Sequence, residues 1–227
     1  MTDDHMINRR QLLGGAAALG LSTLVPRPAR ARSKGVIFAE VNAAGSPAAM
    51  GETHGKAAAA AIKRNVDFYV EWLATAAGLA PKELLQEAAR FAPVLAQYTP
   101  DLLEEIHGIA RGSGRAVNEI LAVNARTDLL VVARRKKKTR KSEANPGCTA
   151  AVVMSRRKKG KPWRSALGQT WDWTPKLKGN QILLRLTPKE GPRLATFTEA
   201  GMVAKIGINQ RRLGVCLNFL AHPSDDP

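Results

Sequence analysis

One cysteine in this chain stands where cutting the backbone could release a nucleophile. Cys148 follows Gly147 and opens a strand-like run, directly after a segment rich in charged and turn-forming residues. A thiol becomes a strong nucleophile once a base takes its proton. If the chain is cut between Gly147 and Cys148, the new α-amine of the cysteine can act as that base. The sequence therefore predicts a cysteine that self-cleavage activates.

Polar and aromatic side chains come soon after this cysteine. Thr149 is adjacent to it, and Gln169, Trp171 and Asp172 follow in the next strand-like run. We expect Thr149, Gln169 and Trp171 to be candidates for a substrate pocket, and Asp172 to act in catalysis. Structural roles stay open as alternatives. A cysteine at a strand start is commonly a core residue, Asp172 could pair with Arg126, and Trp171 could serve packing.

The first half of the chain has the period of helices. Ile62, Val66, Val70 and Leu73 recur at about fourfold spacing, which indicates an amphipathic helix. Glycine and proline residues divide residues 51–132 into several such helices. An opening strand is predicted over residues 35–41. We therefore expect residues 32–147 to form a mainly helical segment.

Beyond the cysteine the period becomes that of strands. Short runs joined by turn-rich segments predict an antiparallel sheet, so that residues 148–227 begin the sheet of an α+β fold. The chain stops without helices to cover this sheet, and we expect it to be truncated at its C-terminus. The predicted strands are residues 149–154, 165–171, 181–187, 193–198, 202–208 and 213–220.

The N-terminal residues resemble an export signal. Arg9 and Arg10 precede an apolar run, and Ala-Arg-Ala at residues 29–31 fits a cleavage site. We expect residues 1–31 to be a twin-arginine signal peptide, recognised by the twin-arginine export machinery, with an uncleaved anchor as the alternative. The mature protein would then be periplasmic or secreted. We predict no structural disulfide, because pairing with Cys216 would block Cys148, and Cys216 is expected to be a core residue.

The net charge of +16 is concentrated in two short runs. Residues 134–141 and 156–164 hold thirteen lysines and arginines on either side of the cysteine. Solvated loops, attraction of an anionic substrate, and binding of nucleic acid or an anionic membrane are three interpretations. No nucleic-acid partner is expected, because aromatic residues are nearly absent from these runs and the export signal directs the chain elsewhere.

Several segments together resemble a known family, the cysteine N-terminal-nucleophile hydrolases of the acyl-coenzyme A:6-aminopenicillanic acid acyltransferase (isopenicillin N acyltransferase) type. The resemblance extends over about the whole mature chain. The segments that carry it are residues 51–55, 106–114, 124–128, 147–150, 168–173 and 198–201.

The resemblance implies a four-layer αββα fold and an enzyme that cuts itself between Gly147 and Cys148 into an α/β heterodimer. Cys148 would then form an acyl-enzyme with a small amide or thioester substrate, anionic as one option. Asp172 would orient the free amine, and Asn218 would stabilise the oxyanion. No metal and no cofactor are implied. Export away from coenzyme A favours hydrolysis over acyl transfer, and an inactive basic binding protein is the alternative.

Overall fold

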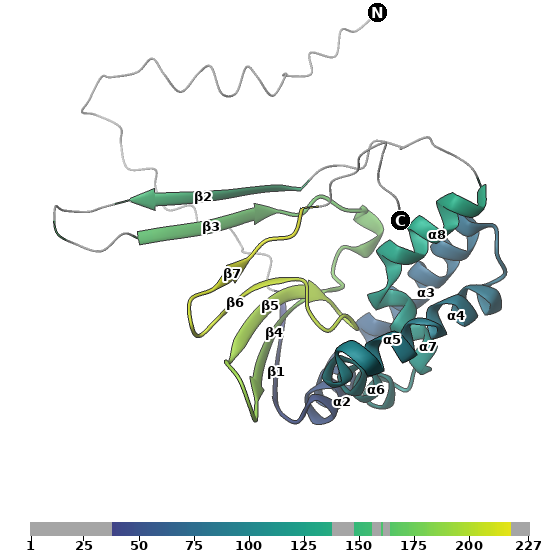
Figure 1. Ribbon diagram of the computed structural model, residues 1–227, viewed down its shortest axis with the longest axis horizontal. Coiled ribbons are helices and arrows are strands. Elements are labelled where there is room, and N and C mark those ends of the chain that lie inside the picture. The colour runs from purple at the N-terminus through teal and green to yellow at the C-terminus, as the bar shows by residue number, and fades with distance from the viewer. Residues whose placement is uncertain (1–37, 138–147, 156–159, 161–163, 219–227) are drawn as a thin grey trace, which may run out of the picture. The chain divides into compact units, whose positions relative to one another are not determined.

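A computed structural model describes residues 38–137, 148–155, 160 and 164–218 of the chain (Figure 1). Helices and strands are largely segregated along it, in an α+β arrangement. The helices are α2 (Pro47–Ala57), α3 (Ala59–Ala77), α4 (Pro81–Ala89), α5 (Phe91–Tyr98), α6 (Pro100–Ser113), α7 (Val117–Asn124), α8 (Arg126–Lys137) and the short 3-10 helix η1 (Pro175–Leu177). The strands are β1 (Ala39–Gly45), β2 (Thr149–Ser155), β3 (Arg164–Thr170), β4 (Gln181–Pro188), β5 (Leu194–Glu199), β6 (Ile206–Asn209) and β7 (Gly214–Val215).

The strands form one five-stranded sheet and one separate hairpin. The sheet has the order β1-β4-β5-β6-β7, and the hairpin pairs β2 with β3. All neighbours are antiparallel except β1 and β4, which are parallel. The antiparallel pairing expected of the strands after Cys148 is confirmed, but β2 and β3 form a separate hairpin, and β1 joins the sheet in parallel beside β4. The helices lie between β1 and β4 in the chain, and such a long crossover is the connection that parallel strands require.

Two sequence predictions on the helical part need correction. The sequence from residue 117 to residue 132 predicts one continuous helix, but the structure divides it at Ala125 into α7 and α8. Helix α8 continues to Lys137, so the start of the basic run at residues 134–137 is helical rather than a loop. Residues 138–141 lie outside the described part of the chain, as does the second basic run except for residues 160 and 164.

Local signals explain where most helices begin and end. The Ser46 side chain accepts a hydrogen bond from the Ala49 N–H at 3.3 Å and caps α2. Pro81 and Pro100 occupy the first positions of α4 and α6, where a missing N–H costs nothing. Gly78 ends α3 with φ of 66°, a left-handed conformation that favours glycine.

Helices α2 and α6 approach so closely that only glycine fits at the contact. A Cβ on Gly51 would lie 2.1 Å from the Glu105 carbonyl oxygen, and one on Gly108 would lie 2.2 Å from that of Ala48. Gly55 and Gly112 continue the same contact one turn further. Two of the segments that carry the family resemblance, residues 51–55 and 106–114, therefore have a packing role.

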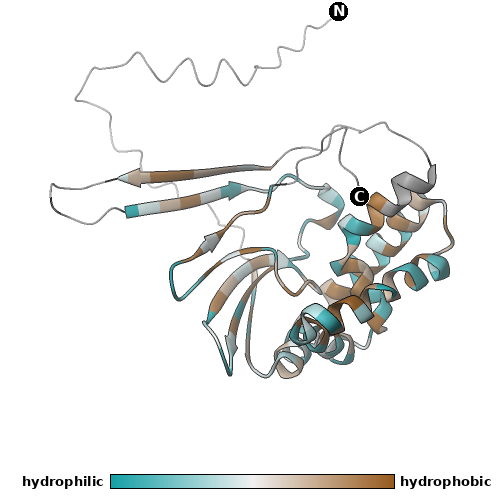
Figure 2. Cartoon of the chain, viewed as in Figure 1, coloured by the Kyte–Doolittle hydropathy of each residue, from teal (hydrophilic) through white to brown (hydrophobic). Residues whose placement is uncertain are grey.

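The core lies between the helices and one face of the five-stranded sheet. Ile62, Val66 and Leu73 of α3 are fully buried, and Leu184 and Leu186 of β4 are buried in the same cluster. Figure 2 shows apolar and polar stretches alternating along the helices and strands that meet at this interface. None of the described helices is both long and apolar enough to span a bilayer. The further layers of an αββα fold stay a prediction.

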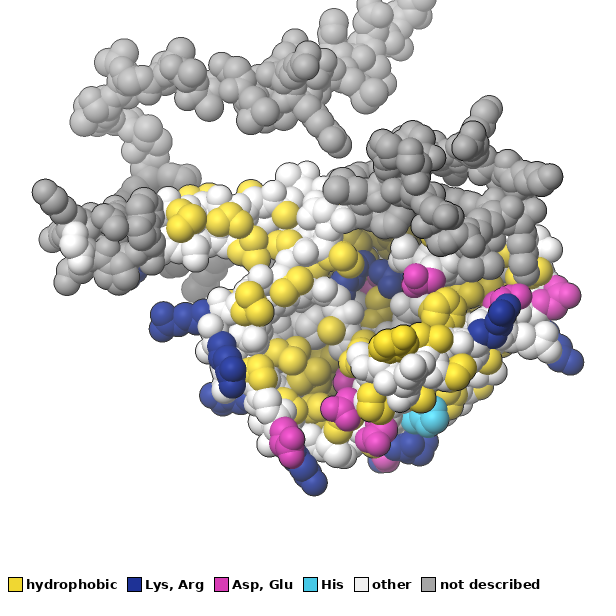
Figure 3. All heavy atoms as spheres, viewed as in Figure 1, with side chains coloured by type: hydrophobic (Ala, Val, Ile, Leu, Met, Phe, Trp, Pro, Cys, Tyr) yellow, Lys and Arg dark blue, Asp and Glu magenta, His cyan; other side chains and the backbone are white. Residues whose placement is uncertain are grey.

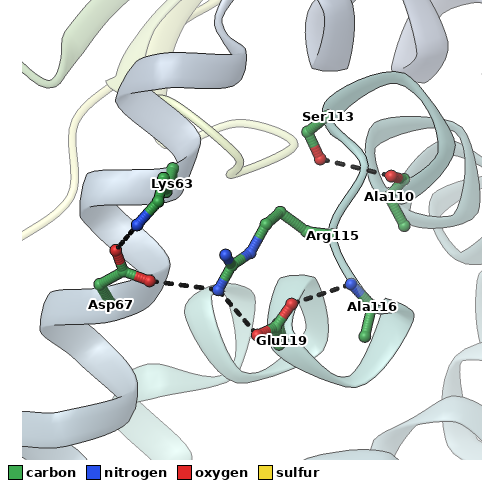
Figure 4. A network of polar contacts seen from close by, with 7 residues as sticks. All are labelled: Lys63, Asp67, Ala110, Ser113, Arg115, Ala116 and Glu119. Atoms are coloured by element: carbon green, nitrogen blue, oxygen red, sulfur yellow. Dashed lines mark hydrogen bonds and ion pairs between the residues drawn. The ribbon is translucent and has the colours of Figure 1, made fainter.

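A polar network joins α3 to the turn between α6 and α7 (Figure 4). The Arg115 guanidinium lies 3.2 Å from Asp67 of α3 and 2.7 Å from Glu119 of α7. Glu119 also accepts a hydrogen bond from the Ala116 N–H at 2.9 Å. Hydrogen bonding from Lys63 lowers the pKa of Asp67, and Arg115 adds to that effect. These contacts fix the direction in which α7 enters the core.

The β2–β3 hairpin exposes apolar side chains. Val152, Val153 and Met154 are each more than 60% exposed, and Leu167 is 43% exposed. Figure 3 shows hydrophobic side chains gathered along this hairpin. Because side chains alternate along a strand, adjacent Val152 and Val153 point to opposite faces, and both faces of the hairpin are open.

Candidate active site

Cys148 directly precedes β2 and is half-buried. Thr149 pairs with Thr170 of β3, and its N–H donates to the Thr170 hydroxyl at 3.2 Å. Because the strands are antiparallel, continuing this register by one residue sets Trp171 opposite Cys148. The start of β2 and the end of β3 thus place the predicted nucleophile Cys148 and the predicted pocket residue Trp171 at the same end of the hairpin.

The segment after β7 reaches the same edge. The Asn218 side-chain amide donates to the Cys148 carbonyl oxygen at 2.7 Å. Gln169 accepts from the Leu217 N–H at 2.9 Å and also donates to the Leu217 carbonyl, so this segment runs along β3. The structure therefore places Asn218 beside Cys148, although the two are 70 residues apart in sequence.

Lys205 and Glu199, for which the sequence predicts no role, form a charged pair next to Trp171. The Lys205 side chain is only 8% exposed, and its Nζ lies 3.6 Å from Oε1 of Glu199, which is fully buried. The same Nζ lies 3.3 Å above the centre of the Trp171 ring, a close cation–π contact. Glu199 belongs to the segment 198–201 that carries the family resemblance, and this was the only signal in the sequence for its role.

A tyrosine of α3 contacts the Glu199 carboxylate. The Tyr69 hydroxyl donates to Glu199 Oε2 at 2.6 Å and accepts from the Trp173 indole at 3.0 Å. Arg126 lies 5.8 Å over the Tyr69 ring. Burial raises the pKa of Tyr69 above its usual value, and the Glu199 charge raises it further. Tyr69 therefore stays protonated and remains a donor to the carboxylate.

Burial and repulsion from Arg126 lower the pKa of Lys205 to about 8. Glu199 and Cys148 act in the opposite direction, because their negative forms favour the ammonium. This part of the site thus holds the Cys148 thiol, the Lys205 amine with its lowered pKa and the buried Glu199 carboxylate.

Side chains from α2, α3 and α7 fix the turn between β5 and β6, from which Lys205 projects. Asn65 donates to the Ala200 carbonyl at 2.7 Å, and His54 Nε2 accepts from the Gly201 N–H at 3.1 Å. Asn124 donates to the Gly201 carbonyl at 2.9 Å and accepts from the Val203 N–H at 3.0 Å. This anchoring explains why β6 begins at Ile206 rather than at residue 202 as expected.

The remaining predicted residues lie in different settings. Asp172 is exposed, and its role beside the nucleophile stays a prediction. Thr149 is exposed and Gln169 is occupied with Leu217. Cys216 was expected in the core but is half-buried, because it directly follows β7, which lies at the edge of the sheet. Arg9, Arg10 and Gly147, and with them the predicted signal and cleavage site, lie outside the described residues.

The chain is similar to a fungal acyltransferase. It is 32% identical over 184 residues to the 40 kDa form of acyl-coenzyme A:6-aminopenicillanic-acid-acyltransferase of Emericella nidulans. The match covers 80% of this chain and 46% of that protein, so the chain spans about half the length of this relative. The chain matches no protein-family model. The similarity supports the family that the sequence motifs resemble.

Proposed function

We propose that the chain is a member of the acyl-coenzyme A:6-aminopenicillanic acid acyltransferase family and forms an acyl-enzyme on Cys148. The observation that carries this proposal is the contact of the Asn218 amide with the half-buried Cys148 at one end of the β2–β3 hairpin, where Trp171 contacts the buried Lys205–Glu199 pair. Similarity to an acyltransferase over 80% of the chain gives independent support.

In the proposed reaction Cys148 becomes an N-terminal residue when the bond to Gly147 is cut. Its α-amine takes the proton of its thiol, and the thiolate attacks the carbonyl carbon of a small amide or thioester. The Asn218 amide, freed from the Cys148 carbonyl, would donate to the resulting oxyanion, a contact typically worth roughly a hundredfold or more in rate. Asp172 would orient the amine. Water or an acceptor amine would then release the acyl group.

The remaining parts of the proposal concern the whole protein. Cleavage would leave an α/β heterodimer, and sheets and helices stacked in four αββα layers would enclose the site. Residues 1–31 would direct export by the twin-arginine machinery to the periplasm or beyond the cell. Since coenzyme A is retained inside cells, hydrolysis of a linear amide is favoured over acyl transfer. The reaction needs no metal or cofactor.

Trapping of the acyl-enzyme tests the proposed nucleophile. The purified protein is incubated with an activated aryl ester of a short acyl chain, and its intact mass is followed over time. We expect the mass of one acyl group to be added to the peptide that begins with Cys148. A Cys216→Ala variant, the matched cysteine control, should acylate at the parent rate, and Cys148→Ala should not acylate. Equal labelling of parent and Cys148→Ala would rule out the proposal.

A further inference from the structure

The segment after β7 brings Asn218 to Cys148 without pairing with β3 as a strand. In the described part of the chain, β7 pairs only with β6, and β3 pairs only with β2. Residues 216–218 nevertheless lie along β3, since the Cys216 thiol is 4.0 Å from the Gly168 carbonyl oxygen and Leu217 bonds to Gln169. A contact other than a backbone ladder therefore fixes this segment beside the hairpin.

The Gln169 side chain provides that contact. Its Oε1 accepts from the Leu217 N–H at 2.9 Å, and its Nε2 donates to the Leu217 carbonyl oxygen. A primary amide carries an acceptor and a donor on the same carbon, so it can bond both backbone groups of one residue. Gln169 thus forms with Leu217 the pair of hydrogen bonds that a residue of a neighbouring strand would form.

The position of Asn218 follows from these two bonds. The Leu217 carbonyl that Gln169 contacts belongs to the peptide group joining Leu217 to Asn218, and this group is planar up to the Asn218 Cα. Fixing the carbonyl oxygen therefore restricts where the short Asn218 side chain can reach. Its amide donates to the Cys148 carbonyl oxygen at 2.7 Å.

The β2–β3 hairpin carries both Gln169 and Cys148. Gln169 pairs with Ala150 of β2, and Cys148 comes two residues before Ala150. Residues that face each other across an antiparallel pair, and residues two apart on one strand, share a face. Continuing β2 by one residue therefore places the side chains of Gln169 and Cys148 on the same face of the hairpin. Gln169 itself is half-buried.

We propose that Gln169 is a positioning residue, which fixes the Leu217 backbone so that the Asn218 amide reaches the reacting atoms at Cys148. Its amide oxygen and nitrogen both contact Leu217, so direct binding of substrate, the role predicted from the sequence, would require these bonds to break. The inference rests on the proposed function, because it concerns how the proposed oxyanion donor is placed.

Acylation kinetics of a Gln169 variant test the role. The purified chain is acylated with the activated aryl ester at increasing concentrations and followed by intact mass. Gln169→Leu removes both hydrogen bonds, and its rate at saturating ester should be at least about tenfold lower than that of the parent. The half-saturating ester concentration should change by less than about threefold, because an oxyanion donor acts in the transition state. Gln210→Leu, at an exposed position between β6 and β7, is the control and should match the parent.

Combination with Asn218→Ala shows whether Gln169 acts through Asn218. Residues that act through one another have non-additive effects. Gln169→Leu should therefore slow the parent but add no further slowing to Asn218→Ala. If the two substitutions slow acylation independently, if Gln169→Leu acylates at the parent rate, or if its main effect is on half-saturation, the positioning role is overturned.

Gln169→Glu tests the need for both hydrogen bonds. A carboxylate can accept from the Leu217 N–H but cannot donate to the Leu217 carbonyl, whereas a protonated carboxyl group can do both. The ratio of the variant rate to the parent rate should therefore rise as the pH falls from 7 towards about 4.3, the usual pKa of glutamate. A ratio that does not change with pH would contradict the role of the donated bond.

Hydrogen exchange separates this role from the proposed function. The Leu217 N–H should exchange about fivefold or more faster in Gln169→Leu than in the parent, with the fold of both checked by circular dichroism. Equal exchange would overturn the positioning role even if the parent acylates. If the parent does not acylate but the exchange differs as expected, the proposed function fails and the placement of the segment by Gln169 is upheld.

Discussion

At the scale of single residues, the Glu199 carboxylate depends on one phenol for its hydrogen bonding. Glu199 is fully buried, its Oε2 accepts from the Tyr69 hydroxyl, and its Oε1 lies 3.6 Å from Lys205 Nζ. Burying a carboxylate is costly unless its hydrogen bonds and charge are satisfied. Tyr69 is therefore a structural support of the site as well as a core residue of α3.

Tyr69→Phe should destabilise the protein because it leaves one oxygen of Glu199 without its donor and frees the Trp173 indole. We expect the free energy of unfolding to fall by about 1–3 kcal/mol, measured by denaturant unfolding. Tyr98→Phe is the matched control, since Tyr98 is 74% exposed and its loss of a hydroxyl should be neutral. An equal effect of the two substitutions would contradict the importance of the Tyr69–Glu199 hydrogen bond.

At the scale of elements, the α2–α6 pair depends on backbone contact. A Cβ on Gly108 would lie 2.2 Å from the Ala48 carbonyl oxygen and 2.8 Å from the Glu52 nitrogen, and helix backbone cannot move aside locally. Gly108→Ala should therefore push the helices apart and lower the free energy of unfolding by about 1–3 kcal/mol. Gly168→Ala, with no atom within 4 Å of its Cβ, should change it far less. Thermal unfolding of the two variants compares them, and similar midpoints would contradict the packing described.

The same two helices bury a pair of groups that titrate in opposite senses. Burial lowers the pKa of His54 in α2 to about 4 and raises that of Glu105 in α6 to about 7. Histidine burial contributes stability that is present above the unfolded value of 6.5 and is lost as pH falls towards 4. Glutamate burial contributes stability that is present below 4.5 and is lost as pH rises towards 7. Between about pH 4.5 and 6.5 these two effects oppose each other.

Glu105→Gln removes one side of this balance. In the parent the two contributions to stability should nearly cancel between pH 4.5 and 6.5. In Glu105→Gln the contribution of His54 is left alone, so the free energy of unfolding should rise with pH by about 1 kcal/mol per unit relative to the parent. Denaturant unfolding at several pH values measures the difference. Parallel profiles for the two proteins would show that Glu105 does not titrate as its burial implies.

Sequence reasoning succeeded where structure is set locally. Gly78, Pro81 and Pro100 mark helix ends because their backbone preferences act within one turn. It made no prediction on the pairing of β1, since parallel pairing depends on where a long helical connection returns. It failed at the start of β6, where Asn124, 79 residues away, holds the backbone of Val203 in a turn.

The candidate site divides in the same way. Cys148 could be predicted because it lies between a charged, turn-rich segment and a strand-like run. Lys205 and Glu199 could not be predicted as site residues, because they are recognised by their burial. The Tyr69 hydroxyl that contacts Glu199 lies 130 residues away in the sequence. The residue pattern of β6 does not indicate that Lys205, just before this strand, contacts the ring of Trp171. Asn218 was predicted from resemblance alone, and its contact with Cys148 depends on the pairing of Gln169 with Leu217.

At the scale of the whole molecule, the apolar surface of the hairpin should make the protein bind hydrophobic probes. Val152 and Met154 lie on one face of β2 and are each 61% exposed. Val152→Thr/Met154→Thr should lower the fluorescence of a dye that reports apolar surface, with little change in the free energy of unfolding. Val94→Thr, at an exposed position of α5, is the control and should leave dye binding nearly unchanged. Undiminished dye binding by the double variant would place the apolar surface elsewhere.

The central claim is that the chain cuts itself to release Cys148 as its nucleophile. Its most direct test is the intact mass of the purified protein beside that of Cys148→Ala. We predict two fragments from the parent that meet between Gly147 and Cys148, and one uncut chain from the variant. A single uncut chain from both proteins would contradict self-cleavage and would favour a basic binding protein instead.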